Sequence, residues 1–95
     1  MARIPVIRIE LGNVTSAKDL HALLMESLGF PSWYGHNWNA FWDAITGLVE
    51  MPEQLVLDGW QQFSLRMPTD AQLMCKCLED MSDMYPLLSS KVVYT

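Results

Sequence analysis

The sequence is poor in positive charge: six lysine and arginine residues stand against eleven aspartate and glutamate residues, which gives a net charge of −5. Binding to nucleic acid phosphates needs a basic patch, so we expect no direct contact with nucleic acid. A basic protein is the complementary kind of partner. On charge alone, however, an acidic surface that merely keeps the protein in solution is the favoured interpretation.

Long apolar runs are also missing. No stretch approaches the roughly 18–20 consecutive apolar residues that a membrane helix needs, and residues 1–5 do not begin the apolar core of a secretory signal. Cysteine is scarce, and Cys75 and Cys77 would point to nearly opposite faces of a helix, so we expect two free thiols. Free thiols suit a reducing compartment, and the chain is therefore predicted to be cytoplasmic.

Apolar residues are plentiful by contrast. They make up 51% of the 95 residues, and aromatic residues make up 11%, which predicts a packed fold rather than disorder. The length suits one domain over residues 1–95. No internal repeat or low-complexity tract divides it.

Two elements are predicted near the N-terminus. Residues 4–11 alternate between apolar and polar side chains, with Ile7, Ile9 and Leu11 on one side, as in a strand with one buried face. A helix is expected over residues 17–28, because Ser16 begins a capping box and Gly29 supplies a left-handed stop.

A second helix is expected to begin after Asn37, which is a good N-cap residue. Gly47 should weaken or end it. Its core-facing stripe follows helical spacing and comprises Trp38, Phe41, Trp42, Ile45 and Val49.

The second half of the chain continues the pattern. The apolar run 55–57 predicts a strand that is covered on both faces, and residues 91–95 predict a last strand. Between them, Thr69 begins a capping box for a third long helix. The apolar face of that helix is expected to comprise Leu73, Met74, Cys77, Leu78 and Met81. Strands separated by helices predict an α/β fold with a three-stranded parallel sheet and flanking helices.

The polar face of the second helix carries the most informative side chains. Asn39, Asp43 and Thr46 follow one another at helical spacing, opposite the core stripe. Asp43 also lies close in sequence to several aromatic residues, and a carboxylate among aromatics is a typical anchor of a protein interface. The alternative is that the aromatics belong to the core and Asp43 is simply solvated, and the pattern alone slightly favours that alternative.

Enzymatic and metal chemistry find little support. His36 and Asp43 are seven residues apart, which is too far for a direct hydrogen bond, and no nucleophile motif or glycine-rich phosphate loop accompanies them. The spacing of the possible ligands His21, His36, Cys75 and Cys77 fits no zinc pattern. We expect no catalytic residue, no metal and no cofactor, and we expect His21 at the surface or boundary of its helix.

Residues 30–47 closely resemble the signature of the barstar family. That pattern is an apolar residue and proline, two aromatics, a glycine and an asparagine, followed by a helix with tryptophan-aspartate and threonine-glycine. Asp19-Leu20-His21 resembles a further family motif, and Glu50, Pro52 and residues 55–57 continue the match. The resemblance is specific over residues 16–60 and only topological over residues 69–95.

The resemblance implies an intracellular inhibitor of secreted guanyl-specific ribonucleases. The second helix and the loop before it would plug the nuclease active site, and Asp43 would be the central acidic anchor that stands in for an RNA phosphate. Other positions that match family contacts are Trp33, Gly35, Trp42, Thr46 and Gly47. The expected partner is a basic ribonuclease or toxin nuclease domain, bound 1:1 as by an immunity protein of a toxin–antitoxin pair, with the free chain a monomer.

Two positions depart from the family pattern. Asn39 replaces an acid one turn before Asp43, and His36 replaces a common acid, so the site carries less negative charge. The family also uses an acid on the third long helix, for which Glu79 and Asp80 are both possible and Asp80 is our candidate. These departures leave open an alternative, a barstar-like binding module whose partner is not a nuclease.

Overall fold

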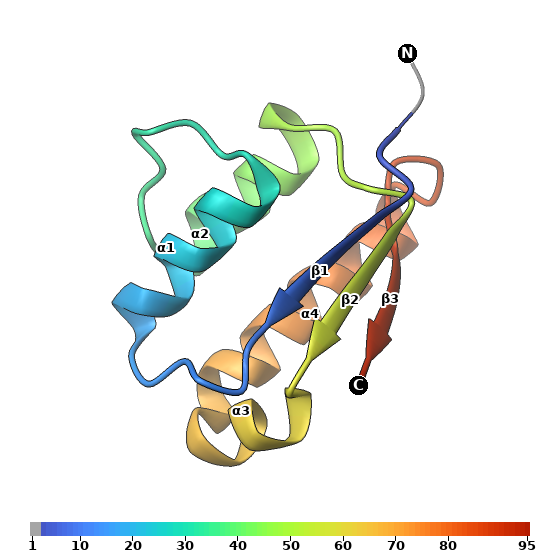
Figure 1. The fold of residues 1–95 in the computed structure, drawn as a ribbon. Coiled ribbons are helices and arrows are strands. Elements are labelled where there is room, and N and C mark those ends of the chain that lie inside the picture. The colour runs from blue at the N-terminus through green and yellow to red at the C-terminus, as the bar shows by residue number, and fades with distance from the viewer. Residues whose placement is uncertain (1–2) are drawn as a thin grey trace.

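The computed structural model describes residues 3–95, and Figure 1 shows how their elements follow one another. In chain order these elements are β1 (Val6–Glu10), α1 (Ala17–Leu28), α2 (Trp38–Asp43), the π-helix η1 (Ala44–Leu48), β2 (Gln54–Asp58), α3 (Trp60–Arg66), α4 (Pro68–Met84) and β3 (Lys91–Tyr94). Among the residues described, no helix is both long enough and apolar enough to cross a membrane.

The three strands form one parallel sheet in the order β1-β2-β3. Leu55 of β2 pairs with Ile7 of β1 on one side and with Val92 of β3 on the other. Parallel pairing requires a long crossover connection between neighbouring strands, and each crossover here contains helices. The predicted α/β fold with a three-stranded parallel sheet and flanking helices is therefore confirmed.

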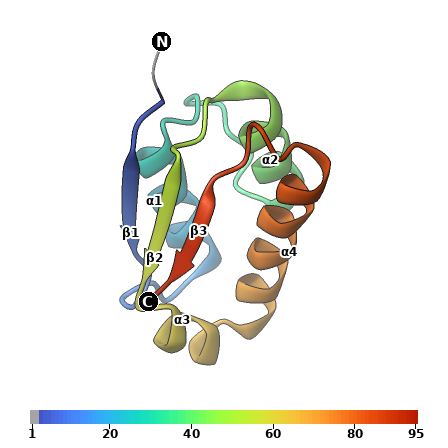
Figure 2. The same cartoon turned by 90° about the vertical axis from the view of Figure 1, so that its right-hand side faces the viewer.

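One face of the sheet is covered by helices, and the core lies between them. Figure 2 shows the strands on one side of the molecule, α4 on the opposite side and α1 behind the strands. Ile9, Leu55 and Leu57 point into this interface and are almost completely buried, together with Leu24 of α1 and Met74 of α4. α2 packs against α4, and Phe41 on α2 is completely buried.

Two of the predicted helix starts are confirmed by the hydrogen bonds at their caps. The Ser16 side chain accepts a hydrogen bond from the backbone N–H of Asp19, and the Asn37 side chain accepts one from Ala40. Gly29 ends α1 in the left-handed conformation, as expected, with φ of 72°.

The predicted start of the third long helix is wrong. α4 begins at Pro68, so Thr69 lies inside its first turn, and Met67 at the cap position makes no side-chain hydrogen bond. Proline at the first helical position needs no N–H partner and has a helical φ already, which allows the helix to start one residue before the predicted cap. Leu73, predicted on the apolar face, is exposed.

A helix that the sequence analysis did not predict, α3, lies between β2 and α4. It buries Phe63 alone among its seven residues, so its sequence shows no apolar stripe. The second predicted helix also differs from expectation, because its regular part ends at Asp43 and continues as the π-helix η1. The wider turn shifts Thr46 and the residues after it around the helix axis relative to the predicted straight stripe.

Candidate protein-binding site

The loop before α2, residues 30–37, is anchored by a buried pair of polar side chains. Nδ1 of His21 on α1 lies 2.7 Å from the hydroxyl oxygen of Tyr34, and both side chains are buried. The expectation that His21 lies at the helix surface is therefore wrong. Burial is possible because Tyr34, thirteen residues later, satisfies the imidazole. The pair fixes the loop to α1.

Burial also changes how this pair titrates. Loss of hydration lowers the pKa of His21, and it outweighs the nearby Asp70 carboxylate, which acts in the opposite direction. Burial likewise raises the pKa of the Tyr34 phenol. At neutral pH the anchor therefore consists of two uncharged groups.

A tight turn joins this anchor to α2. His36 adopts a left-handed conformation with φ of 53°, and its Nδ1–H donates to the carbonyl oxygen of Tyr34 at 2.8 Å. The side-chain amide of Asn37 donates to the carbonyl of Gly35 at 3.0 Å while its oxygen caps α2. These bonds hold the backbone of the loop, whereas the side chain of Trp33 is 70% exposed. The loop thus presents a large aromatic side chain on a fixed backbone.

Trp38 ties the start of α2 to α4. Its indole Nε1–H donates to Oδ1 of Asp70 at 2.9 Å, and its ring packs edge-on against His21, with 4.7 Å between ring centroids. Phe41, one turn further along α2, is completely buried, and its ring packs against that of Trp38. The short helix is therefore held in place by tertiary contacts, which a helix of six residues requires.

A groove of about 440 Å³ runs between α2 and α4. Three of the predicted site residues on α2 line it, and so does Asp80 from α4. The full lining is Trp38, Asn39, Trp42, Asp43, Leu73, Lys76, Cys77 and Asp80. The groove therefore combines aromatic and aliphatic walls with two carboxylates and one amide.

One positive charge also lies in this groove. Nζ of Lys76 is 3.4 Å from Oδ2 of Asp80, and the side chains are 71% and 45% exposed. Asp43 is exposed and forms no ion pair among the described residues, so its carboxylate is open to a partner. The arrangement suits a cationic group with an apolar stem, which could pack on the tryptophans while its charge meets Asp43.

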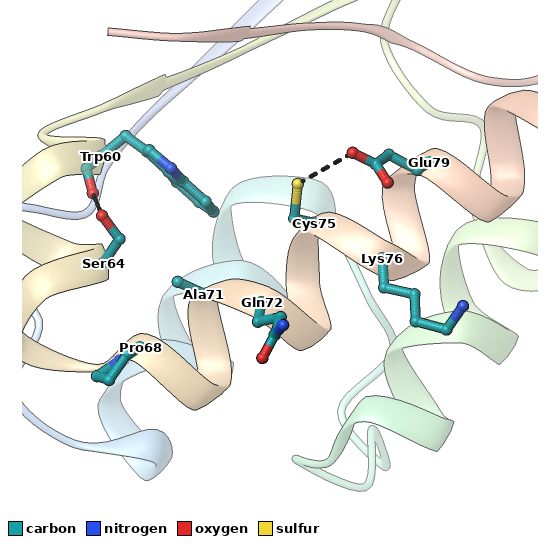
Figure 3. Close-up of a pocket in the computed structure, with 8 residues that line it drawn as sticks. All are labelled: Trp60, Ser64, Pro68, Ala71, Gln72, Cys75, Lys76 and Glu79. Atoms are coloured by element: carbon teal, nitrogen blue, oxygen red, sulfur yellow. Dashed lines mark hydrogen bonds between the residues drawn. The ribbon is translucent and has the colours of Figure 1, made fainter.

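The structure separates the two acids that the sequence analysis considered on α4. Asp80 lines the groove beside α2, whereas Glu79 points into a different and larger hollow of about 700 Å³ between α3 and α4 (Figure 3). There its carboxylate accepts a hydrogen bond from the Cys75 thiol at 3.4 Å. Asp80 is the acid that shares a groove with Asp43.

The remaining predicted site residues do not line the groove. Trp33 and Gly35 lie in the exposed loop before α2. Thr46 lies in η1, where its hydroxyl donates to the carbonyl of Trp42 at 2.6 Å, and it borders a small cavity on the other side of that turn. Gly47 follows it and is exposed. These residues therefore flank the groove at the two ends of α2.

The groove residues that were not predicted as site residues are Trp38 on α2 and Leu73, Lys76 and Cys77 on α4. The three α4 residues and the predicted Asp80 follow the spacing i, i+3, i+4 and i+7, which places them on one helix face. That spacing was available in the sequence. It could not be used without knowing that α2 packs against this face.

Comparison with known proteins agrees with the fold. The family model described as "Barstar (barnase inhibitor)" matches residues 4–93, which includes the last helix and strand, where the sequence analysis found only a topological likeness. A Bacillus subtilis (strain 168) protein with the name "Putative ribonuclease inhibitor YrdF" is 45% identical over 42 residues. The aligned part is 44% of this chain and 46% of that protein, so it spans about half the length of the relative.

Proposed function

This chain is a member of the barstar family, and on that premise we propose that it inhibits a ribonuclease by inserting α2 and the loop before it into the active site. The observation that carries the proposal is the exposed carboxylate of Asp43 on a braced helix, in a groove that also holds Asp80. The family description and the name of the similar Bacillus subtilis protein point to the same activity.

The charge and rigidity of this surface suit a nuclease. A ribonuclease binds phosphate in a basic groove, and a carboxylate can take the place of that phosphate among the cationic groups. Because Trp38, Tyr34 and Asn37 already hold the loop and α2, little conformational entropy is lost on binding. Trp42 beside Asp43 would exclude water and strengthen the charge contact.

The flanking residues would complete the contact surface. Trp33 and Gly35 lie before α2, and Thr46 and Gly47 lie after it. The side chain of Trp33 would bury a large aromatic area on contact, while Gly47 would allow a close approach of the partner backbone. The chain itself would carry out no reaction.

The biological setting that we propose is the cytoplasm of the producing cell. There one inhibitor molecule would bind one basic ribonuclease or toxin nuclease domain, as an immunity protein does. In this proposal residues 1–95 act as one domain, and the free protein is a monomer. The net charge of −5 supports attraction to a basic partner.

A binding module with a non-nuclease partner is the second candidate. It is favoured by Asn39, which supplies an amide where the family pattern has an acid, and by Lys76, which lies in the groove and pairs with Asp80. Both features reduce the negative charge that a phosphate-binding groove would meet.

The decisive experiment is a titration of the protein into barnase and into a panel of basic microbial ribonucleases and toxin nuclease domains, with RNA cleavage as the readout. We expect complete inhibition of at least one nuclease at equimolar concentration. Asp43→Ala should weaken that complex by about 3–6 kcal/mol, as a central charged anchor does. It should leave the free energy of unfolding nearly unchanged, because Asp43 is an exposed helix residue.

Asp80 and Glu79 supply a matched pair for the same experiment. Each substitution to alanine removes one negative charge from α4, but Asp80 alone of the two lines the groove. We expect Asp80→Ala to weaken inhibition and Glu79→Ala to leave it close to wild type. Full activity of every nuclease in excess inhibitor would overturn the proposal and favour the second candidate.

A further inference from the structure

We propose that the surface contacting the ribonuclease extends beyond the groove onto an uncharged apolar rim at the end of α4, formed by Tyr85, Leu87 and Leu88. This inference rests on the proposed function and adds a second contact region to it. Figure 2 shows that the end of α4 and the loop after it lie at the same end of the molecule as α2.

The three side chains of the apolar rim are exposed to solvent although they are large and apolar. The exposed fraction is 89% for Leu87, 55% for Leu88 and 41% for Tyr85. Single exposed leucines are common on protein surfaces, but adjacent large apolar side chains on one loop form a patch, and such patches mark interaction sites.

The backbone that carries the rim is fixed rather than loose. The guanidinium of Arg3 donates to the carbonyl oxygens of Leu87, Leu88 and Ser89, at distances of 3.4, 3.4 and 2.9 Å. The same guanidinium donates to the carbonyls of Met51 at 2.8 Å and Pro52 at 2.7 Å. Arg3 therefore joins the rim to the segment before β2, and a partner would not have to order this loop on binding.

The rim is continuous with the proposed site. The ring of Tyr85 lies beside that of Trp42, with 6.5 Å between centroids, and Trp42 lines the groove. Leu88 and Thr46 border the same small cavity of about 60 Å³. A partner that covers Trp42 therefore also reaches Tyr85, the first residue of the rim.

Charge and size identify the partner surface that fits. Residues 85–90 read Tyr-Pro-Leu-Leu-Ser-Ser and contain no charge, whereas the groove holds Asp43 and Asp80. The matching surface on the nuclease is apolar and lies next to its basic groove. A standard interface needs about 800 Å² from each partner, more than a helix of six residues and its loop are expected to supply, and the rim would provide additional area.

The test compares three leucine variants. Leu87→Ala and Leu88→Ala truncate the rim, and Leu65→Ala is the matched control, because Leu65 is 77% exposed on α3, at the far end of the molecule from α2. Affinity and dissociation rate are measured on barnase, or on the panel nuclease that the wild-type protein inhibits. We expect each rim variant to dissociate about tenfold faster with an unchanged association rate, and Leu65→Ala to match wild type.

The outcomes separate this inference from the proposed function. Rim variants that dissociate like Leu65→Ala, from a nuclease whose inhibition still depends on Asp43, would overturn the rim and leave the function standing. No inhibition by the wild-type protein would overturn both. Sedimentation of the free protein as a dimer that Leu87→Ala dissociates would instead assign the rim to self-association and overturn its role in nuclease binding.

Discussion

A buried histidine and a buried tyrosine hold the presentation loop at the scale of single residues. Nδ1 of His21 and the hydroxyl of Tyr34 are 2.7 Å apart, and Trp38 packs against the same imidazole. Asp70 faces His21 from α4 and His36 faces it from the loop. One imidazole thus touches α1, the loop and the start of α2, and its charge state matters to all three.

The lowered pKa of His21 leads to a pH prediction. In the unfolded chain His21 binds a proton near pH 6.5, whereas in the folded chain it does so at lower pH. The contribution of His21 to the free energy of unfolding therefore falls as the pH drops below about 6.5. The slope for one proton is at most about 1.4 kcal/mol per pH unit. Urea unfolding at pH 7.5 and 5.5 measures it, and His21→Gln should reduce the difference between the two pH values. An unchanged difference in that variant would locate the pH dependence elsewhere.

Single residues also show where sequence reasoning stopped. Asp43 became the candidate anchor through the family resemblance, because the residue pattern alone slightly favoured a simply solvated acid, and its exposure on α2 fits both interpretations. Burial of His21 could not be predicted, because its partner comes from a separate loop. Choosing between Asp80 and Glu79 required the packing of α4 against α2, since adjacent residues on a helix differ by about 100° in direction.

Two short helices were the least predictable parts at the scale of elements. Strong N-cap residues predicted the starts of α1 and α2, and both predictions are confirmed. α3 begins after Gly59 in a left-handed conformation without a side-chain cap, and α4 begins at a proline. No residue pattern in the sequence indicates the π-helix η1.

Gly47 in η1 gives a prediction that separates stability from binding. It is exposed, and a Cβ atom added there would meet no heavy atom within 4 Å. Gly47→Ala should therefore stabilise the free protein by about 0.5–1 kcal/mol, because the unfolded chain loses freedom. If Gly47 contacts the partner as proposed, the added methyl should raise the Kd several-fold. Urea unfolding and inhibition titrations measure the two effects, and an unchanged Kd would place Gly47 outside the interface.

Gly29 and Gly59 form a matched pair in the left-handed region, with φ of 72° and 70°. A Cβ at Gly29 meets nothing within 4 Å, whereas one at Gly59 would lie 2.6 Å from the backbone nitrogen of Gly12. We expect Gly29→Ala to cost about 1–2 kcal/mol of stability from backbone strain alone, and Gly59→Ala about 3 kcal/mol or more. Chemical denaturation of both variants checks this. Equal losses of stability in the two variants would mean that the backbone at Gly12 moves aside at little cost in free energy.

Charge acts at the scale of the whole molecule. With a net charge of −5 and a basic partner, the association rate should fall about tenfold or more between 0.05 and 0.5 M salt. Stopped-flow mixing with the inhibited nuclease measures this rate. Asp43→Ala should reduce the salt dependence, while Leu87→Ala should retain it. A rate that does not vary with salt would contradict electrostatic steering.

The overall architecture was the most predictable level. Alternation of strand and helix patterns is enough to indicate a parallel sheet, because right-handed crossovers leave few other arrangements. The failure to predict α3 did not alter that result, because α3 lengthens one crossover without changing the order of the strands.

The parallel sheet affects how long the chain takes to fold. Val6 pairs with Gln54 and Gln54 with Lys91, so the partners are 48 and 37 residues apart in the chain. Pairings this distant form slowly, in milliseconds to seconds rather than microseconds. α2, with six residues, is too short to persist before the rest has assembled. A newly made chain would therefore inhibit the nuclease only after this folding time. A nuclease that folds faster would be active until then.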